Sequence, residues 1–519
     1  MKISVCQIAP QVGFLKENFS LIEKCYFEAC NSGADICVFP ELSSSGYLAE
    51  DLFLDKSFIQ HIEQHTNDFA KKTKKTCALL PTIIIENGKL YNGVVAAMNG
   101  LIIGTTYKKH LPNHGIFDEK RYFESGIPSV ISINGIKVGI PICADIWSDD
   151  VCQDLKEQGA EIFIIPNGSP FEKGKMDLRI EHVKSRFAET SVPLIYCNQA
   201  LSQDGITFDG RSFCFDGTLN IIGDSFKTSN QMISFKDNKF FPNMTYPYPV
   251  DKCDMIYDAM VLGTRDYVRN NGFEKVILGL SGGIDSALVA SIATDALGAN
   301  NVSAIMMPSK FTSKESIEDA NEVATLLNIN LINIPIDNIL DSFARDLNMD
   351  QNSVAYQNLQ SRIRGTILMA ESNKTDALLL TSGNKSEYAT GYATIYGDMN
   401  GAFNPIKDIY KTELYEIARY KNTLPKNVLS KAPSAELAYN QKDSDSLPEY
   451  PILDSILEKY LEHDYSRDEL YKEFNHDLVD RILLLVKNSE FKRRQSAIGV
   501  KISCKNFEKD RRFPITSGY

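Results

Sequence analysis

One segment near the middle of the chain combines an apolar run, a glycine-rich turn and an alanine-rich stretch. Apolar residues 276–278 precede Ser281-Gly-Gly-Ile-Asp-Ser286, and residues 287–293 are small or apolar. This order predicts a strand, a tight loop and a helix. Paired glycines let a backbone approach a ligand closely, and the free N–H groups of a first helical turn attract anions. The segment therefore predicts an α/β layer with a phosphate site.

An ordinary tight connection between a strand and a helix is an alternative explanation. Two features favour a nucleotide. No Gly-Lys-Ser/Thr follows as in a Walker A loop, and Asp285 can hold Mg²⁺ against phosphates. The segment resembles the Ser-Gly-Gly-x-Asp-Ser loop of the ATP pyrophosphatases, which split ATP between its α and β phosphates. The resemblance implies an ATP site at Gly279, Leu280, Ser281, Gly282, Gly283, Ile284, Asp285 and Ser286.

The size and charge of the chain limit what it can be. A length of 519 residues predicts roughly two to four domains. A formal net charge of −12 argues against a nucleic-acid partner. The 11 cysteines include no Cys-x-x-Cys pair, which predicts reduced, buried thiols. No apolar run is long enough to span a membrane, and the start at Met1–Pro10 predicts a strand instead of a signal peptide. We therefore expect a cytoplasmic protein without a membrane partner.

Residues 1–240 alternate short apolar runs with amphipathic stretches. The amphipathic segment 17–30 lies between apolar runs at 3–8 and 36–39. Further apolar runs occupy 77–85, 94–98, 101–106, 136–142, 162–165 and 194–197. The pattern predicts many strands and a few helices in a layered α/β or α+β domain.

Three residues of this region that can carry chemistry each follow an apolar run. They are Glu41, Lys108 and Cys143. The ends of core strands share one rim of a sheet, so the three side chains can meet there. Each residue alone also has a structural explanation: a surface acid, a solvated lysine and one buried cysteine among several.

The sequence around these residues resembles the nitrilase, or carbon-nitrogen hydrolase, superfamily. Matching segments are Phe39-Pro-Glu-Leu42, Tyr107-Lys-Lys-His-Leu-Pro-Asn-His114, Gly139-Ile-Pro-Ile-Cys-Ala-Asp-Ile-Trp147 and Pro166-Asn-Gly-Ser-Pro170. The resemblance implies an αββα sandwich and covalent amide hydrolysis. Cys143 would be the nucleophile, Glu41 the general base and Lys108 the group that stabilises the tetrahedral intermediate.

The same resemblance implies residues that bind glutamine. Ser169 and Lys175 match positions that hold the α-amino acid end of the substrate, and Glu119 matches a second acid beside the triad. Two positions depart from the family pattern. His114 replaces a tyrosine that touches glutamine, and Ala144 replaces a glutamate that usually follows the cysteine. The triad itself is intact, so we expect amide hydrolysis.

A proline-rich segment without periodicity, 241–252, predicts a linker to a second domain at 253–519. Helical patterns at 254–270, 313–327 and 357–372 are interleaved there with apolar runs. These runs occupy 302–307, 331–336 and 377–381. The alternation predicts a doubly wound parallel sheet, in which ligands bind at the carboxyl ends of the strands.

Several segments of this second domain resemble NAD synthetases. They are Met307-Pro-Ser-Lys-Phe-Thr-Ser313, Gln357-Asn-Leu-Gln-Ser-Arg-Ile-Arg364, Thr381-Ser-Gly-Asn-Lys-Ser-Glu387 and Phe491-Lys-Arg-Arg-Gln495. With the nitrilase-like half in front, the chain is similar to glutamine-dependent NAD synthetases. The resemblance implies glutamine, deamido-NAD and ATP as substrates, a passage for ammonia and a homo-oligomer. It places ATP at Ser382, deamido-NAD at Asn358, Glu387, Asp398 and Lys492, and Mg²⁺ at Asp285 and Glu387.

Some alternatives stay open at this point. Lys411 and Asp408 can steady the nucleotide, or they can be a solvated lysine and an acid at a helix N-terminus. A pyrophosphatase with a Cys, His, Glu glutaminase is disfavoured because the chain has only 7 histidines. Residues 1–240 can also be a non-catalytic scaffold, which would leave an ammonia-dependent synthetase.

Overall fold

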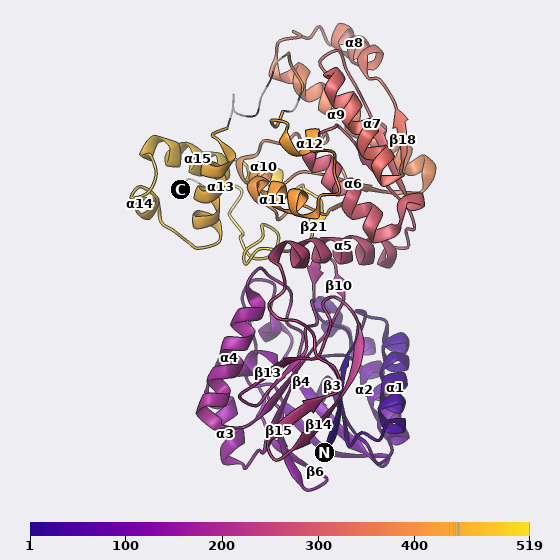
Figure 1. The fold of residues 1–519 in the computed structure, drawn as a ribbon, viewed down its shortest axis with the longest axis vertical. Coiled ribbons are helices and arrows are strands. Elements are labelled where there is room, and N and C mark those ends of the chain that lie inside the picture. The colour runs from indigo at the N-terminus through magenta and orange to yellow at the C-terminus, as the bar shows by residue number, and fades with distance from the viewer. Residues whose placement is uncertain (435, 440, 442, 444–446, 518–519) are drawn as a thin grey trace. The chain divides into compact units, whose positions relative to one another are not determined.

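The computed structural model describes residues 1–434, 436–439, 441, 443 and 447–517, and the chain divides into two compact units, Met1–Val250 and Asp251–Tyr519 (Figure 1). The division falls inside the segment that we predicted as a linker. Strand β15 (Lys239–Pro242) includes its first two residues, and helix α5 (Lys252–Asn270) begins at its last. Residues 435, 440, 442, 444–446 and 518–519 of the predicted second domain lie outside the described residues.

The first unit contains two large sheets. A seven-stranded sheet has the order β15-β14-β1-β2-β3-β4-β5, and a six-stranded sheet has the order β13-β12-β9-β8-β7-β6. The strands of the first are β1 (Lys2–Gln7), β2 (Ile36–Val38), β3 (Cys77–Glu86), β4 (Lys89–Met98), β5 (Leu101–Tyr107) and β14 (Ser229–Lys236), with β15. Those of the second are β6 (Val130–Ile133), β7 (Ile136–Gly139), β8 (Ile162–Asn167), β9 (Leu194–Asn198), β12 (Phe213–Phe215) and β13 (Leu219–Ile221). A short hairpin pairs β10 (Ser202–Gln203) with β11 (Ile206–Thr207).

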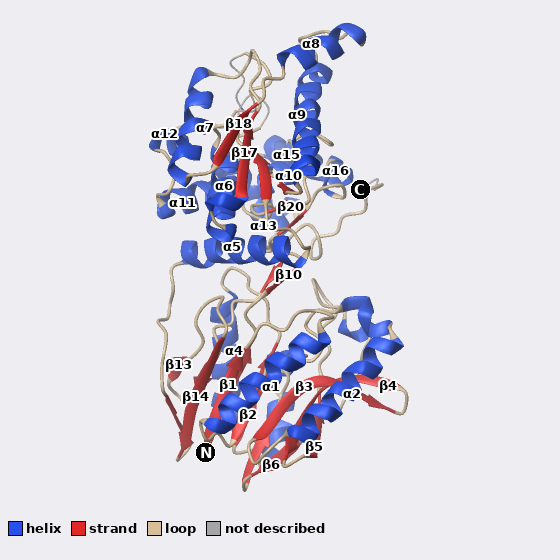
Figure 2. Cartoon of the chain, turned by 90° about the vertical axis from the view of Figure 1, so that its right-hand side faces the viewer, coloured by secondary structure: helices blue, strands red, loops and turns tan. Residues whose placement is uncertain are grey.

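The sheets pack face to face, and helices cover their outer faces (Figure 2). Strand β2 shows how the sequence builds these layers. Ile36 and Val38 enter the core between the sheets, whereas Cys37 and Phe39 pack under α1 (Leu15–Asn31). This alternation follows from the two-residue period of a strand. The other outer helices are α2 (Lys56–Lys72), α3 (Asp150–Glu157) and α4 (Lys175–Thr190). The predicted αββα sandwich is confirmed.

The second unit is built on a parallel sheet. Its order among the described residues is β18-β17-β16-β19-β20-β21. The strands are β16 (Val276–Gly279), β17 (Val302–Met306), β18 (Asn330–Asn333), β19 (Leu378–Leu380), β20 (Phe403–Asn404) and β21 (Ile498–Gly499). Strand β16 has β17 on one side and β19 on the other, so the chain reverses its direction of travel across the sheet there. A crevice at the carboxyl ends of strands is expected at such a point.

Helices lie on both faces of this sheet (Figure 2), which confirms the predicted doubly wound architecture. Helix α6 (Ile284–Leu297) is buried along most of its length, because it consists mainly of alanines and branched apolar residues on every side. The other helices are α7 (Lys314–Leu327), α8 (Asp337–Asp346), α9 (Val354–Thr375), α10 (Lys385–Thr390), α11 (Lys411–Lys421), α12 (Lys426–Ser430), α13 (Tyr450–Leu461), α14 (Arg467–Leu470), α15 (His476–Asn488) and α16 (Glu490–Arg493). Within the described residues, none of the helices has the length and apolar content that a membrane crossing requires.

Candidate active sites

Three buried side chains meet in the first unit, and each comes from the end of a core strand. Glu41 follows β2, Lys108 follows β5, and Cys143 begins a 3₁₀ turn, Cys143–Trp147, shortly after β7. The Lys108 ammonium donates to Glu41 Oε1 at 2.6 Å, and the charges of Glu41 and Lys108 both act on the nearby Cys143 thiol. Neither Lys108 nor Glu41 is exposed to solvent. The structure thus brings together the three residues that the sequence singled out.

A second acid shares the lysine. Lys108 Nζ donates to Glu119 Oε1 at 2.7 Å, and the Tyr47 hydroxyl donates to the same oxygen at 2.6 Å. Burial raises the pKa of Glu119 to about 7 although Lys108 opposes the shift, and the charge on Glu41 adds to it. Two carboxylates therefore compete for one buried cation near neutral pH.

The nucleophilic thiol is held in a strained position. Cys143 has a φ of 45°, a left-handed conformation that is unfavourable for a residue with a side chain. Burial, and then the neighbouring Glu41, raise the pKa of its thiol well above the ordinary value. The resting thiol is therefore protonated, and Glu41 is the base placed to take its proton.

Asp145 joins the segments that carry the lysine and the cysteine. Its carboxylate accepts from the backbone N–H groups of Lys109 at 3.1 Å, His110 at 2.8 Å and Ile142 at 2.9 Å. These bonds fix the chain directly after Lys108 and directly before Cys143. This role of Asp145 was not predicted from the sequence, although a buried carboxylate commonly binds several backbone N–H groups.

Two further donors bind Glu41. The Asn92 side-chain amide donates to Oε1 at 2.8 Å, and the backbone N–H of Gly168 donates to Oε2 at 3.0 Å. The catalytic carboxylate is therefore anchored at both oxygens. Neither donor could be predicted from the sequence, because a backbone N–H carries no side-chain pattern and Asn92 lies inside strand β4.

We expect Gly168→Ala to disturb this site. A Cβ atom at residue 168 would lie 2.4 Å from Tyr47 Cδ1, and Tyr47 is fully buried. To relieve this overlap, either the Tyr47 ring, whose hydroxyl binds Glu119, or the backbone N–H of residue 168, which binds Glu41, must move. Glutamine hydrolysis should fall at least tenfold and stability by about 1–3 kcal/mol, as measured by release of glutamate and by thermal unfolding. Wild-type glutamate release would contradict the need for glycine.

The predicted glutamine-binding residues Ser169, Lys175 and His114 differ in their burial and in their contacts. Ser169 is buried next to Gly168, and its hydroxyl accepts from Arg179 Nε at 3.0 Å. Lys175 Nζ lies 3.4 Å from Glu172 Oε2 and 4.8 Å from the ring centre of Trp147, at the end of the turn that carries Cys143. His114 is exposed and packs edge-on to Phe117 at 5.8 Å.

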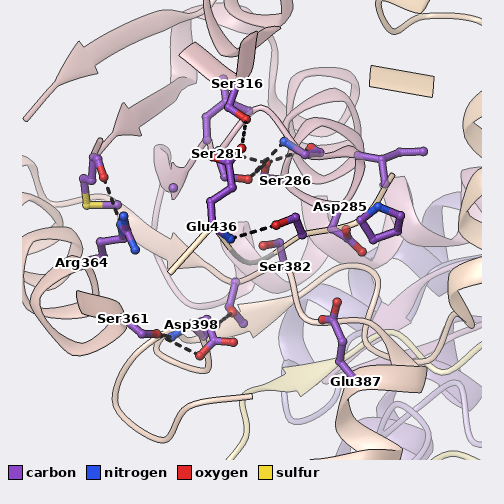
Figure 3. Close-up of a pocket in the computed structure, with 18 of the residues that line it drawn as sticks. Ser281, Asp285, Ser286, Ser316, Ser361, Arg364, Ser382, Glu387, Asp398 and Glu436 are labelled. Carbon is purple, nitrogen blue, oxygen red and sulfur yellow. Dashed lines mark hydrogen bonds between the residues drawn. The ribbon is translucent and has the colours of Figure 1, made fainter. Parts of the chain in front are cut away.

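The glycine-rich segment of the second unit lines a pocket at the carboxyl ends of β16, β17 and β19 (Figure 3). The Ser281 and Ser286 hydroxyls lie 3.1 Å apart, and the backbone N–H of Gly283 donates to Ser281 Oγ at 3.2 Å. Gly282 has a φ of +82°, and a Cβ there would lie 2.2 Å from the carbonyl oxygen of Ser316. Only glycine fits this turn, which opens onto the start of α6 as an anion site requires.

Two carboxylates of this pocket converge on one ammonium group. Lys411 Nζ lies 2.5 Å from Asp285 Oδ2 and 3.8 Å from Glu387 Oε1. Burial, and then the charge on Asp285, raise the pKa of Glu387 to about 8. Carboxylate oxygens that already enclose a cation suit Mg²⁺, which takes one or two protein carboxylates and completes its shell with phosphate oxygens and water. No cluster of three or more metal-binding side chains occurs among the described residues.

The remaining predicted residues of this unit divide into two groups. Ser382 and Asp398 line the pocket, as Figure 3 shows. Asn358 and Lys492 are not among the lining residues. Asn358 accepts from Thr394, which does line the pocket, and Lys492 Nζ donates at 2.7 Å to the backbone carbonyls on either side of Tyr392, another lining residue. Asp408 pairs with the buried Lys385 at 2.9 Å, so its role is structural but is not that of an acid at a helix N-terminus. Lys411 is buried and paired with Asp285, so the alternative of a solvated lysine is wrong.

The sequence analysis missed other residues of the pocket wall. Arg364 on α9 donates to the carbonyl of Met307 at 3.0 Å, and burial lowers the pKa of its guanidinium to about 10. The Ser361 hydroxyl donates to Asp398 at 3.1 Å. Glu436 accepts from the Ser316 hydroxyl at 2.8 Å. An apolar helical period predicts α9 but does not show which of its polar residues face a ligand.

Comparison with known proteins agrees with this division of the chain. The carbon-nitrogen hydrolase family model matches residues 2–234, and the NAD synthase family model matches residues 256–496. The glutamine-dependent NAD(+) synthetase of Acinetobacter baylyi is 40% identical over 100% of this chain and 98% of its own length. That of Thermotoga maritima is 38% identical over 100% and 99%.

A solved structure supports the same relationship. The glutamine-dependent NAD+ synthetase from Acinetobacter baumannii, in complex with adenosine diphosphate, matches with a TM-score of 0.81 and 36% identity, covering 99% of this chain and 98% of that one. The two family models, the full-length identity and the matching fold lead to one conclusion: the chain belongs to the family of glutamine-dependent NAD(+) synthetases.

Proposed function

We propose that the protein converts deamido-NAD to NAD(+) with ATP, and that glutamine supplies the nitrogen. One observation carries the proposal: the same chain holds a buried Cys143, Glu41 and Lys108 cluster and a separate pocket with a phosphate loop. Residues 1–240 act as the glutaminase, 241–252 as the linker and 253–519 as the synthetase.

In the glutaminase site, the sulfur of Cys143 attacks the carboxamide carbon while Glu41 takes the thiol proton. Lys108 stabilises the negative charge on the tetrahedral oxygen. The carbon–nitrogen bond breaks, and the proton from Glu41 leaves with the ammonia. Water, deprotonated by Glu41, then cleaves the thioester to glutamate and restores the thiol. Glu119 holds Lys108, and Ser169, Lys175 and His114 bind the substrate.

In the synthetase site, the carboxylate of deamido-NAD attacks the α phosphorus of ATP and pyrophosphate leaves. Ammonia then displaces AMP from the acyl adenylate and forms the amide. The loop from Gly279 to Ser286, with Ser382, binds ATP, while Asn358, Glu387, Asp398 and Lys492 bind deamido-NAD. Asp285 and Glu387 would hold Mg²⁺, which supplies positive charge against the phosphates.

Two further properties of the protein are a passage for ammonia, which we propose from the chemistry, and a homo-oligomer. Ammonia at neutral pH is largely ammonium, which is not a nucleophile, so we propose a protected passage for ammonia between the two sites. The homo-oligomer stays a prediction. The intact contacts among Glu41, Lys108 and Cys143 argue against a scaffold without activity.

The products of ATP cleavage test the synthetase assignment. We expect one AMP and one pyrophosphate for each NAD(+) formed from deamido-NAD, Mg²⁺ and ATP, with either glutamine or ammonium as the nitrogen source. Chromatography of the nucleotides and a pyrophosphate assay give both counts. Stoichiometric ADP would overturn the assignment, because it would mean cleavage at the terminal phosphate.

A further inference from the structure

Among the described residues, Asn92 donates to the general base through a neutral amide, whereas Lys108 donates through a charged ammonium and Gly168 through its backbone N–H. Asn92 lies in β4, is 1% exposed, and donates from Nδ2 to Glu41 Oε1 at 2.8 Å. Its backbone carbonyl accepts from the N–H of Lys108 at 2.9 Å. This one residue therefore binds both the base and the segment that carries the lysine.

The hydrogen bonds of the Asn92 amide differ from those of Asn198. Asn198, which is also fully buried, uses both ends of its amide: Oδ1 accepts from Ser169 N–H, and Nδ2 donates to the carbonyls of Ser169 and Gly210. In Asn92, Oδ1 is buried with no donor among the described residues. A buried acceptor without a partner is costly. Within the described part of the chain, Asn92 leaves its carbonyl oxygen without a donor while its amide nitrogen binds Glu41.

The charges around Glu41 explain why an amide suits this position. Lys108 is the cation that faces it, while Glu119, the Cys143 thiol and the Tyr47 hydroxyl face the cluster from other segments. Lys108 is shared with Glu119. The Asn92 amide, in contrast, donates to Glu41 alone among the residues that the structure describes. It binds the carboxylate without adding a positive charge that would also attract Glu119 or the thiolate of Cys143.

Resting on the proposed glutaminase function, we infer that Asn92 is a positioning residue for the reaction with glutamine: its amide fixes Glu41 Oε1 in the orientation that serves Cys143. It acts through Glu41 and not through the substrate. Its loss should therefore lower kcat and leave the KM for glutamine nearly unchanged.

The first variant removes the donor. Asn92→Leu should lower the kcat of glutamine-driven synthesis by roughly tenfold to a hundredfold, the usual value of a hydrogen bond to a charged group. Synthesis from ammonium should stay within about twofold of wild type. Alkylation of Cys143 by iodoacetamide, followed by peptide mass mapping, should slow in parallel, because Glu41 takes the thiol proton.

The second variant keeps the shape of the Asn92 side chain but replaces its amide donor by a carboxylate oxygen, which is an acceptor. Asn92→Asp places a carboxylate against Glu41, and the two acids share a proton at neutral pH. Glutamine-driven kcat should fall at pH 7 and recover as the pH rises, whereas Asn92→Leu should show no such recovery. Thr106→Val is the matched control. Thr106 is buried in the neighbouring strand β5 and its hydroxyl accepts from Ser129 N–H, so kcat should stay within about twofold.

The outcomes separate this inference from the proposed function. Asn92→Leu with wild-type kcat, an equal loss from glutamine and ammonium, or a wild-type pH profile for Asn92→Asp would each overturn the inference. If Cys143→Ala still uses glutamine, the proposed glutaminase fails and the inference fails with it. If Cys143→Ala is inactive with glutamine while Asn92→Leu is not, only the role of Asn92 is wrong.

Discussion

Cys143→Ala should eliminate NAD(+) synthesis from glutamine and leave synthesis from ammonium within about twofold of wild type. Loss of a nucleophile costs several orders of magnitude in rate, and no other group in the cluster can form the thioester. The acyl adenylate in the second unit reacts with ammonia from any source. Rescue by ammonium should increase with pH, because unprotonated ammonia attacks. Parallel assays with glutamine and ammonium chloride, each at several pH values, measure both reactions.

Cys152→Ala is the matched control for this variant. Cys152 lies in α3 and is also buried, yet it takes no part in the cluster. Its loss should cost at most a few kcal/mol of stability and change both reactions alike. Equal loss from both nitrogen sources in Cys143→Ala would mean that this cysteine is structural. Full activity with glutamine would remove the nitrilase-like mechanism altogether.

The fold was predictable where the pattern is local. The apolar runs at 3–8, 36–39 and 276–278 identify the strands β1, β2 and β16; Glu41 follows β2, and the loop after β16 leads to Asp285 at the start of α6. Residues at such ends were found from the sequence because a polar residue directly after an apolar run is a visible signal. The layered architecture of both units follows from the same runs.

Long-range pairing was not predictable. Strand β14 pairs with β1 from Lys2 opposite Ser234 to Gln7 opposite Ser229. It is polar and only partly buried, so its sequence resembles a loop. Strand β15 pairs with its other edge locally, but the partner that places it inside the sheet, β1, lies more than two hundred residues away.

The same limit applies to the sites. Asn92 and Arg364 lie inside regular elements, and which face of a strand or helix meets the ligand depends on packing. The structure also shows the surroundings of the two departures from the family pattern, His114 and Ala144. His114 is exposed beside Phe117, and the turn after Cys143 is fixed by Asp145 instead of residue 144. The triad contacts are therefore complete although both substitutions are present.

Asp285→Asn should nearly abolish NAD(+) synthesis from glutamine and from ammonium while the protein stays folded. Asparagine matches aspartate in shape and can still accept from Lys411, and helix-terminal effects at this position are worth only about 1 kcal/mol. What the substitution removes is one negative charge of the pair that would hold Mg²⁺. We expect weaker Mn²⁺ binding by electron paramagnetic resonance, a steep rise in the Mg²⁺ needed for turnover and an unchanged circular dichroism spectrum.

Asp295→Asn supplies the comparison, because it lies at the other end of α6 and its carboxylate accepts from the Tyr257 hydroxyl at 2.7 Å, away from the pocket. Both variants remove one charge from the same helix, so a loss confined to Asp285→Asn is a property of the site and not of net charge. Wild-type turnover by Asp285→Asn at limiting Mg²⁺ would show that the metal is held elsewhere. A loss seen with glutamine but not with ammonium is also incompatible with the proposal, since the adenylate must form before either nitrogen source can react.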